Sequence, residues 1–380
     1  MNKEEINKLK SKMQDDIAEL SVLHPALIIE AGTGFGKSWA LIKSIHLSKS
    51  KKRWLVVVPE IAQIANFKQE IINSGININD KIEDVICYAS LKNYANTQVN
   101  IALNEVQSLN DNRLEIVQTI EYDRIIADSA TIPDDIKYNL SQLGNFHTYS
   151  LPLKEAINLG ILPEPKIFVI KININSITDK FEYTKFGKKY SVIAAEYYQY
   201  LSDQVKYWRN RFNRENEMYM QNKSLQFASM RKRFMATLKT IKAKEFVDKF
   251  IKEKRRFIVF SGTIPQSEEI CSNKKLCVHS KKSSKVNAKT IEDFNDLKTS
   301  EIYATGMLVS GMTLSKLDTG LVVQLDSGEN DNGLKITQQI GRILRDNNPE
   351  MYILVLEDSK DEDYLKTTIN SIGKEFFNYL

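Results

Sequence analysis

Cysteine and histidine are scarce in this sequence of 380 residues, which holds three cysteines and four histidines. Cys87, Cys271 and Cys277 offer no even disulfide framework, and the sequence has no C-x-x-C pair of the kind that begins a zinc site. We therefore expect reduced thiols and no structural zinc.

Long hydrophobic runs are missing as well. No stretch of about 18 uncharged apolar residues occurs, and Met1–Asp16 is highly charged where a signal peptide needs an apolar segment. These absences predict a cytoplasmic protein without a membrane partner. Hydrophobic residues still make up 42% of the sequence, which is typical of a folded globular protein. Because a single core seldom grows beyond about 250 residues, the length favours two lobes.

Positive charge is concentrated in one region. Gln204–Arg256 contains 16 Lys and Arg against 5 Asp and Glu, a local excess of +11, whereas the whole chain has a formal charge of only +5. Aromatic residues are interleaved with this charge, as expected for a surface that binds a phosphate backbone and displaces its counterions. A solvated helical face explains the charge alone equally well.

Short apolar runs alternate with polar or helical segments. The first half has such runs at residues 26–30, 54–58, 85–88, 99–103 and 123–127, and the second half at residues 257–260, 301–304, 319–325 and 351–356. This alternation predicts a parallel sheet with helices on both faces, formed twice.

The middle of the chain has a different pattern. Residues 151–165 contain three prolines and are predicted as a crossover, residues 167–174 are predicted as a strand, and residues 194–254 are rich in helix formers without proline or glycine. We therefore predict an α/β protein whose first lobe spans residues 1–165 and whose second lobe spans residues 255–380. The crossover and a basic helical insertion or linker occupy residues 166–254.

The strongest local signal is the segment E-A-G-T-G-F-G-K-S at Glu30–Ser38, which lies between a predicted strand and a predicted helix. Glycines let backbone amides converge on phosphate oxygens, while the lysine reaches the terminal phosphates and the serine hydroxyl can ligate magnesium. The segment thus predicts ATP and Mg²⁺ as ligands, bound by Gly32, Thr33, Gly34, Gly36, Lys37 and Ser38.

The form A-x-T-G-x-G-K-S resembles motif I of the superfamily 2 helicases, of the DEAD/DEAH-like and compact phage type. Near the other end, Gln338–Arg345 reads Q-Q-I-G-R-I-L-R and resembles motif VI of the same superfamily, Q-x-x-G-R-x-x-R. The resemblance covers most of the chain and implies two RecA-like lobes. It also implies that Gln338, Arg342 and Arg345 act at the ATP site, the two arginines from one helix face as arginine fingers.

A nucleotide hydrolase also needs an acidic pair at a strand end, and two segments qualify. The run at residues 125–128 ends in Asp128, but no glutamate follows it. The run at residues 99–103 is followed by Asn104 and Glu105. We favour the second, because Ser129-Ala130-Thr131 resembles motif III of the family, which implies that Ser129 and Thr131 couple the ATP state to lobe movement.

Motif II of the family normally reads Asp-Glu-x-His or Asp-Glu-x-Asp, and this sequence departs from it at Asn104 and Gln107. We predict that Glu105 is catalytic and that Asn104 and Glu105 form the magnesium site with Ser38. An amide lacks the charge that favours the ion, so hydrolysis is expected to be slow or to demand high magnesium.

Weaker similarities occur at Val56–Pro59 (motif Ia), Tyr88–Leu91 (the next backbone-contacting segment), Phe257–Ser261 (motif IV) and Tyr303–Met307 continuing through Gly311 (motif V). They imply that nucleic acid is contacted at Pro59, Ser90, Thr305 and Gly306. Gln14 lies upstream of motif I, where the family often has an adenine-reading glutamine.

These features predict an ATP-dependent helicase or translocase acting on single-stranded or branched nucleic acid. DNA is favoured over RNA, with a role in phage or mobile-element replication, recombination or repair, because the chain is compact. Two alternatives stay open: an RNA helicase, and a degenerate ATPase that works as a nucleic-acid-binding module, suggested by Asn104 and Gln107. The basic insertion is predicted to act as a clamp or duplex-separating element. Whether activity requires a protein partner also stays open.

Overall fold

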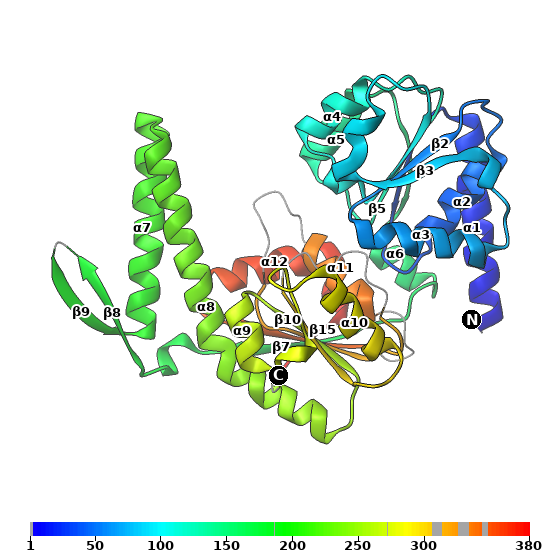
Figure 1. Cartoon of the computed structure of the whole chain (residues 1–380). Coiled ribbons are helices and arrows are strands. Elements are labelled where there is room, and N and C mark those ends of the chain that lie inside the picture. Colours follow the sequence, from blue (N-terminus) through cyan, green and yellow to red (C-terminus); the bar gives the residue numbers. More distant parts are fainter. Residues whose placement is uncertain (1–2, 186, 272, 306–313, 326–333, 344–348) are drawn as a thin grey trace.

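The first lobe is built around a six-stranded parallel sheet. The computed structural model (Figure 1) describes residues 3–185, 187–271, 273–305, 314–325, 334–343 and 349–380. The strands are arranged in the order β3-β2-β4-β5-β1-β6. Their bounds are β1 (Ala26–Ala31), β2 (Trp54–Val58), β3 (Ile82–Cys87), β4 (Asn100–Asn104), β5 (Ile125–Ser129) and β6 (His147–Leu151).

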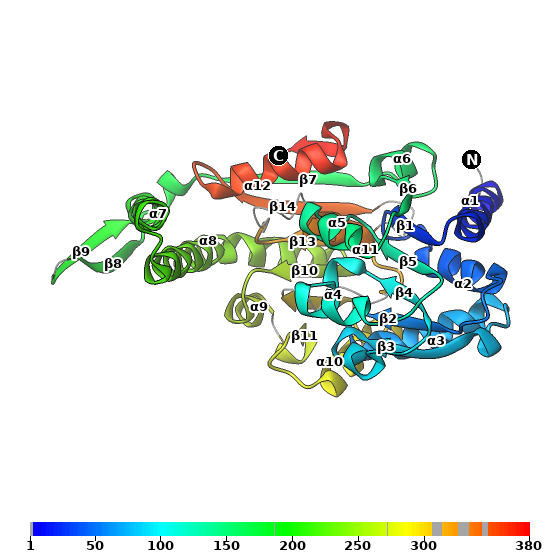
Figure 2. The same ribbon diagram turned by 90° about the horizontal axis from the view of Figure 1, so that it is seen from above.

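Helices cover both faces of this sheet, since each connection between parallel strands crosses over it. They are α1 (Lys3–Leu23), α2 (Lys37–Leu47), α3 (Ile61–Ser74), α4 (Asp111–Gln118), α5 (Asp134–Ser141) and α6 (Leu153–Asn158), with short 3₁₀ helices η1 (Asn79–Lys81), η2 (Tyr88–Tyr94) and η3 (Val106–Ser108). The strand order places β5 between β1 and β4, and the carboxyl ends of these three strands meet at one edge of the sheet (Figure 2).

The second lobe has a seven-stranded sheet in the order β11-β12-β10-β13-β14-β7-β15, and its strands are also parallel. The strands are β7 (Lys166–Ile172), β10 (Phe257–Ser261), β11 (Cys277–Val278), β12 (Glu301–Thr305), β13 (Thr319–Val322), β14 (Glu350–Leu356) and β15 (Phe377–Tyr379). The helices are α9 (Ile264–Ile270), α10 (Ser284–Asn295), α11 (Leu334–Ile343) and α12 (Lys360–Ile372), with η4 (Ile174–Ser176), η5 (Lys274–Leu276) and η7 (Lys374–Phe376).

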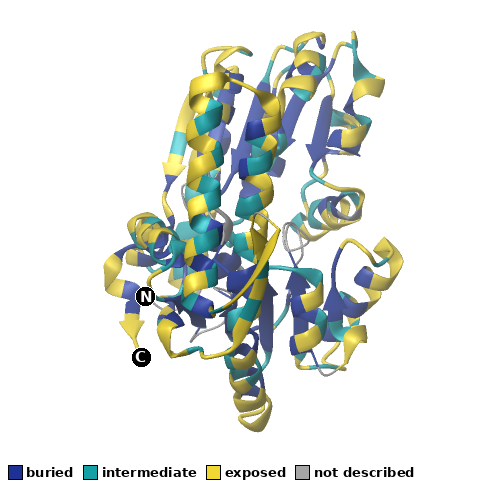
Figure 3. Cartoon of the chain, turned by 90° about the vertical axis from the view of Figure 1, so that its left-hand side faces the viewer, coloured by how far each residue is buried: buried dark blue, intermediate teal, exposed yellow. Residues whose placement is uncertain are grey.

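An insertion follows β7. It consists of the antiparallel hairpin β8 (Lys180–Lys185) and β9 (Lys188–Ile193) and the helices α7 (Ala194–Glu215) and α8 (Met218–Lys252). We call residues 180–233 the arm. It projects from the second lobe, and its two helices are largely exposed (Figures 1 and 3). At about 1.5 Å per residue, the 35-residue α8 is about 50 Å long.

The remaining part of α8 is the foot of the arm and packs on the second lobe. Ala243, Val247 and Phe250 are buried against strand residues such as Val259 and Leu354. The predicted fold class, two parallel α/β lobes with a helical insertion, is therefore confirmed. The lobe limits at residues 165 and 254 stay predictions, and β7 is hydrogen-bonded within the second sheet.

None of the helices in the described ranges is both long and apolar enough to cross a lipid bilayer.

Candidate nucleotide-binding and hydrolysis site

The glycine-rich segment forms a tight loop between β1 and α2. Gly34 and Gly36 have φ values of 95° and 94°, a left-handed conformation that residues with a Cβ rarely adopt. A Cβ at position 36 would lie only 2.6 Å from the Gln14 side-chain nitrogen, so a larger residue there would displace Gln14 from its hydrogen bond with the loop. The loop leads directly into the first turn of α2, where Lys37 and Ser38 lie and unpaired backbone N–H groups favour an anion.

Lys37 extends across the loop toward the end of β4. Its Nζ lies 3.1 Å from the carbonyl oxygen of Ala31 and 3.9 Å from Oε1 of Glu105. The lysine side chain is 8% exposed. The structure thus brings together the predicted phosphate-binding lysine and the predicted catalytic glutamate, which are 68 residues apart in the chain.

Gln14 and a neighbouring lysine on α1 hold the loop from the other side. The Gln14 Nε2 donates hydrogen bonds to the carbonyls of Phe35 at 3.2 Å and Gly36 at 3.4 Å, and the Nζ of Lys10 donates to Gly34 at 3.1 Å. Gln14 is therefore positioned at the nucleotide loop. Its recognition of adenine stays a prediction.

The two candidate segments for motif II end side by side. Asn104 on β4 is in register with Asp128 on β5, and the Asn104 Nδ2 lies 3.1 Å and 3.0 Å from the two carboxylate oxygens of Asp128. Glu105 follows at φ 50°, a backbone conformation that is costly for a residue with a side chain and is concentrated at functional sites. Sequence reasoning treated the two segments as alternatives and set Asp128 aside because no glutamate follows it in the chain.

Asp128 is 1% exposed, and its surroundings act strongly on its charge. Burial raises the pKa of this carboxyl to about 7, opposed by the positive charge of Lys37 and reinforced by the negative charge of Glu105. Hydrogen bonds from the Asn104 side chain and the Glu105 backbone lower the pKa. The charges of Lys37 and Glu105, the two residues that define the predicted site, therefore both act on the Asp128 carboxyl group.

Gln107 connects motif II with motif III. Its Nε2 donates to Oε2 of Glu105 at 2.9 Å, and its Oε1 lies 2.6 Å from the Ser129 hydroxyl. The backbone N–H of Thr131 in turn donates to the Ser129 Oγ at 3.3 Å. An amide can donate at one end and accept at the other, so glutamine is able to bridge the two motifs. This role was missed because the sequence comparison treated Gln107 only as a departure from histidine.

The second lobe approaches the loop through α11, which faces the first lobe (Figures 1 and 2). A Cβ added to Gly341 would lie 2.5 Å from the Cβ of Thr33, so helix and loop are in direct contact. Gln338 and Arg342 belong to α11, and Arg345 lies outside the described residues. The catalytic roles of these three residues stay predictions.

The predicted nucleic-acid contacts are spread over both lobes. Pro59 follows the carboxyl end of β2, Ser90 lies in η2 directly after β3, and Thr305 ends β12 and is 8% exposed. Gly306 lies outside the described residues. The three described positions all lie at carboxyl ends of strands, and their contacts with nucleic acid stay predictions.

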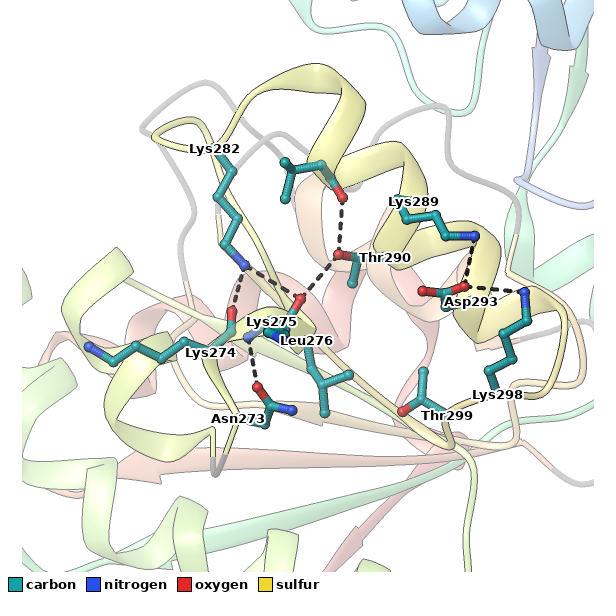
Figure 4. A pocket seen from close by; sticks show the side chains of 11 residues that line it. Asn273, Lys274, Lys275, Leu276, Lys282, Lys289, Thr290, Asp293, Lys298 and Thr299 are labelled. Carbon is teal, nitrogen blue, oxygen red and sulfur yellow. Dashed lines mark hydrogen bonds and ion pairs between the residues drawn. The ribbon is translucent and has the colours of Figure 1, made fainter.

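A separate hollow of about 670 Å³ lies in the second lobe and is lined by Lys274, Lys275, Lys282, Lys289 and Lys298 (Figure 4). It is located before the amino ends of β11 and β12, on the opposite edge of the sheet from the end of β12. Much of its charge is already engaged, since Lys289 and Lys298 each pair with Asp293 at 3.1 Å and 3.4 Å. It is not part of the nucleotide site.

Comparison with known proteins finds a family model that matches part of the chain. Residues 239–347 match the family model described as the helicase conserved C-terminal domain. This region includes the segment that resembles motif VI. No curated protein sequence matches the chain.

Several solved structures share the fold of nearly the whole chain. Yeast (S. cerevisiae) Dbp5 bound to RNA and ADP BeF3 is 13% identical with a TM-score of 0.63, covering 97% of this chain and 89% of that chain. The Pyrococcus furiosus Hef helicase domain is 12% identical with a TM-score of 0.52, covering 94% and 97%. The ATP-dependent Type ISP restriction-modification enzyme LlaBIII bound to DNA is 10% identical with a TM-score of 0.54, covering 97% and 30%. The two sheets are thus RecA-like lobes in the arrangement of helicase cores.

Proposed function

We propose that this chain is an ATP hydrolase of the superfamily 2 helicase type that moves along or unwinds nucleic acid, with DNA as its track. The observation that carries the proposal is the contact between the phosphate loop and α11. Thr33 of one lobe and Gly341 of the other meet at the loop that leads into Lys37, whose Nζ lies 3.9 Å from Glu105. A nucleotide at this interface would be sensed by both lobes, as coupling of hydrolysis to lobe movement requires.

The residues present fit a magnesium nucleotide. The loop offers backbone amides and a lysine for phosphate, Ser38 offers a hydroxyl, and the ends of β4 and β5 offer an amide and two carboxylates. Ser38 and the Asn104 region would hold the ion, which when bound neutralises charge on the phosphate oxygens. Lys37 stabilises negative charge on the terminal phosphate, and Glu105 orients the attacking water and accepts its proton.

The lobes would then alternate between closed and open states. With ATP bound, Arg342 and Arg345 of the second lobe complete the site and favour closure, and hydrolysis removes this preference. Nucleic acid lying across both lobes would be gripped alternately, mainly through phosphate contacts with little sequence preference. Dbp5 with RNA and LlaBIII with DNA offer precedents for either polymer on this fold. DNA as the track and a phage or mobile-element origin stay predictions.

Gly341→Ala is expected to lower polymer-stimulated ATP hydrolysis by about tenfold. The new Cβ would approach Thr33 to 2.5 Å, and overpacking of this kind costs about 1–3 kcal/mol. Alanine favours the helix itself by about 1 kcal/mol over glycine, so lost helicity cannot explain a loss of activity. Adding Thr33→Gly, which removes the opposing Cβ, should restore part of the rate. Full activity of Gly341→Ala in steady-state assays would contradict lobe closure through this contact.

Gln107→Leu is expected to lower kcat for ATP hydrolysis by about tenfold. It removes a hydrogen bond to a charged group, which contributes about 1.5 kcal/mol or more, and it disconnects Glu105 from Ser129. Gln107→His keeps a donor and an acceptor and should retain most of the rate. If leucine and histidine variants hydrolyse ATP equally fast, the bridge is not part of the mechanism.

The arm is proposed as a nucleic-acid clamp or duplex-separating element. Residues 180–233 contain 12 Lys and Arg against 5 Asp and Glu. Tyr183 stacks on Tyr200 with ring centroids 3.9 Å apart, and Tyr190 of the adjacent strand is 39% exposed. Lysines beside exposed tyrosines suit a strand whose phosphates are neutralised and whose bases can stack.

Combining Lys206→Glu with Arg233→Glu, both exposed on the arm, is expected to weaken binding of a single-stranded oligonucleotide. The slope of log affinity against log salt should fall by about 2, because each lost phosphate contact contributes about 1. Lys51→Glu serves as the matched control, because Lys51 is exposed, lies outside the arm and precedes the amino end of β2. If affinity and slope, measured by fluorescence anisotropy, are unchanged, the arm does not contact the nucleic acid.

A further inference from the structure

Asp128 is a buried carboxylate that the family pattern does not explain. It lies near the carboxyl end of β5, paired with Ile29 of β1 on one side and Asn104 of β4 on the other. Its position is thus between the strand that leads into the phosphate loop and the strand that carries Glu105. Ser129 and Thr131, which resemble motif III, follow immediately.

The partners of Asp128 are polar but not oppositely charged. Both of its oxygens accept hydrogen bonds from the Asn104 amide, at 3.1 Å and 3.0 Å, and the backbone of Glu105 contributes another. Among the described residues, Asp128 forms no ion pair within 4 Å, although the charge of Lys37 acts on it. A carboxylate buried without a bonded cation is unfavourable, and packing alone would be better satisfied by an apolar side chain.

The hydrogen bonds also orient Asn104. Because its NH₂ group is directed at Asp128, the acceptor that Asn104 can offer elsewhere is its Oδ1. Asn104 and Asp128 together then contain one carboxylate and one amide oxygen at the end of two adjacent strands. Motif II of the family would place this carboxylate on β4, at position 104. The formal charges of the site, one lysine and two carboxylates, are the same in both arrangements.

We propose that Asp128 supplies the carboxylate of the magnesium shell that position 104 lacks, so that the acidic group has moved from β4 to the neighbouring strand β5. This inference rests on the proposed function, because it assumes a magnesium nucleotide at the loop. It removes the reason to expect a degenerate site: the ion would still meet two carboxylates, Glu105 and Asp128, with the Asn104 oxygen as an additional acceptor for a bound water.

The proposal predicts that restoring the family residue at position 104 impairs the site. Asn104→Asp alone would set two carboxylates about 3 Å apart, the separation now between the amide and Asp128, and like charges at that distance oppose each other's ionisation. The single change should therefore impair the site. Exchanging the residues, Asn104→Asp with Asp128→Asn, keeps the charge and the hydrogen bond and should give a working site.

The experiment measures binding of a fluorescent ADP analogue to the full chain, with Mg²⁺ and with EDTA. For the natural chain, Mg²⁺ is expected to tighten binding. Asp128→Asn, which is nearly isosteric, should lose about tenfold of that enhancement, the usual scale for residues that support a metal, while binding in EDTA stays within about twofold. The exchanged double variant should recover the enhancement. Asp123→Asn, on the exposed amino-terminal side of β5, is the matched control and should behave like the natural chain.

The outcomes separate the two proposals. If the natural chain binds no nucleotide under either condition, the proposed function itself fails. If it binds with a Mg²⁺ enhancement that Asp128→Asn leaves intact, only the role of Asp128 is overturned. A folded Asp128→Asn variant whose melting temperature changes while its Mg²⁺ enhancement persists would likewise show that Asp128 acts on stability alone. Loss in the single variant with recovery in the exchange would support the proposal.

Discussion

Lys37→Ala is expected to reduce ATP hydrolysis by about a hundredfold to a thousandfold, the range seen when one preorganised charge-stabilising donor is removed from an active site. The lysine lies at the first turn of α2 with its Nζ between the Ala31 carbonyl and Glu105. No water can replace it at equal strength, because the side chain is nearly buried and fixed in place. Initial rates of phosphate release at saturating magnesium ATP measure the effect.

Lys43→Ala provides the control for this substitution. Lys43 lies on the same helix and pairs with Asp15 of α1 at 2.7 Å, away from the loop. Lys43→Ala should leave the rate of hydrolysis within about twofold. The ion pair that it removes joins Lys43 to a carboxylate that is 58% exposed, and ion pairs at the surface contribute little to stability. If both lysine variants retain the natural rate, the loop does not hold the reacting phosphate.

Lys239→Ala is expected to destabilise the second lobe by about 3–5 kcal/mol, because it leaves a buried carboxylate without its cation. Lys239 on α8 and Asp361 at the start of α12 are both 0% exposed, and their Nζ and Oδ2 are 2.6 Å apart. Asp361 also accepts from the backbone of Leu356 at 3.0 Å and from Gln324 at 3.2 Å. Burial lowers the pKa of Lys239, and the attraction of Asp361 opposes that shift. The network fixes the foot of the arm to the sheet.

Urea unfolding followed by circular dichroism should show the loss as an earlier transition of the second lobe. Replacing both partners, Lys239→Met with Asp361→Leu, removes the uncompensated charge and should recover much of the stability. Lys242→Ala, one turn further along α8 and 41% exposed in its pair with Glu245, should change the free energy of unfolding by less than about 1 kcal/mol. A Lys239→Ala variant as stable as the Lys242→Ala variant would contradict the anchoring role.

The sequence predicted local structure well where glycine and periodicity determine it. The helix predicted after the glycine-rich segment is present as α2, and β1 extends one residue beyond the predicted run at residues 26–30. The hairpin β8–β9 was missed because both strands are rich in lysine and mostly exposed, so neither forms an apolar run. Aromatic contacts such as Tyr183 with Tyr190 connect the two strands. Likewise β6 is mostly exposed and polar, so it has no apolar signature.

The composition of the site could be predicted only in part, because spacing along the chain does not reveal strand order. Asn104 and Asp128 are 24 residues apart, and only the insertion of β5 between β1 and β4 makes them neighbours. The motif order indicated Lys37 and Glu105, and the structure places the Lys37 Nζ 3.9 Å from the Glu105 carboxylate, while their roles stay predictions. The bridging role of Gln107 was accessible from chemistry, since its amide offers the donor and the acceptor that the bridge needs.

The most direct test of the central claim is steady-state ATP hydrolysis by the natural chain with magnesium, alone and with single-stranded DNA or RNA of the same sequence. A coupled motor should hydrolyse ATP faster when its track is present, and the account predicts stimulation by DNA greater than by RNA, abolished by Lys37→Ala. Greater stimulation by RNA would support a motor that acts on RNA instead of DNA. Hydrolysis that neither polymer alters, or no hydrolysis at all, would contradict the account.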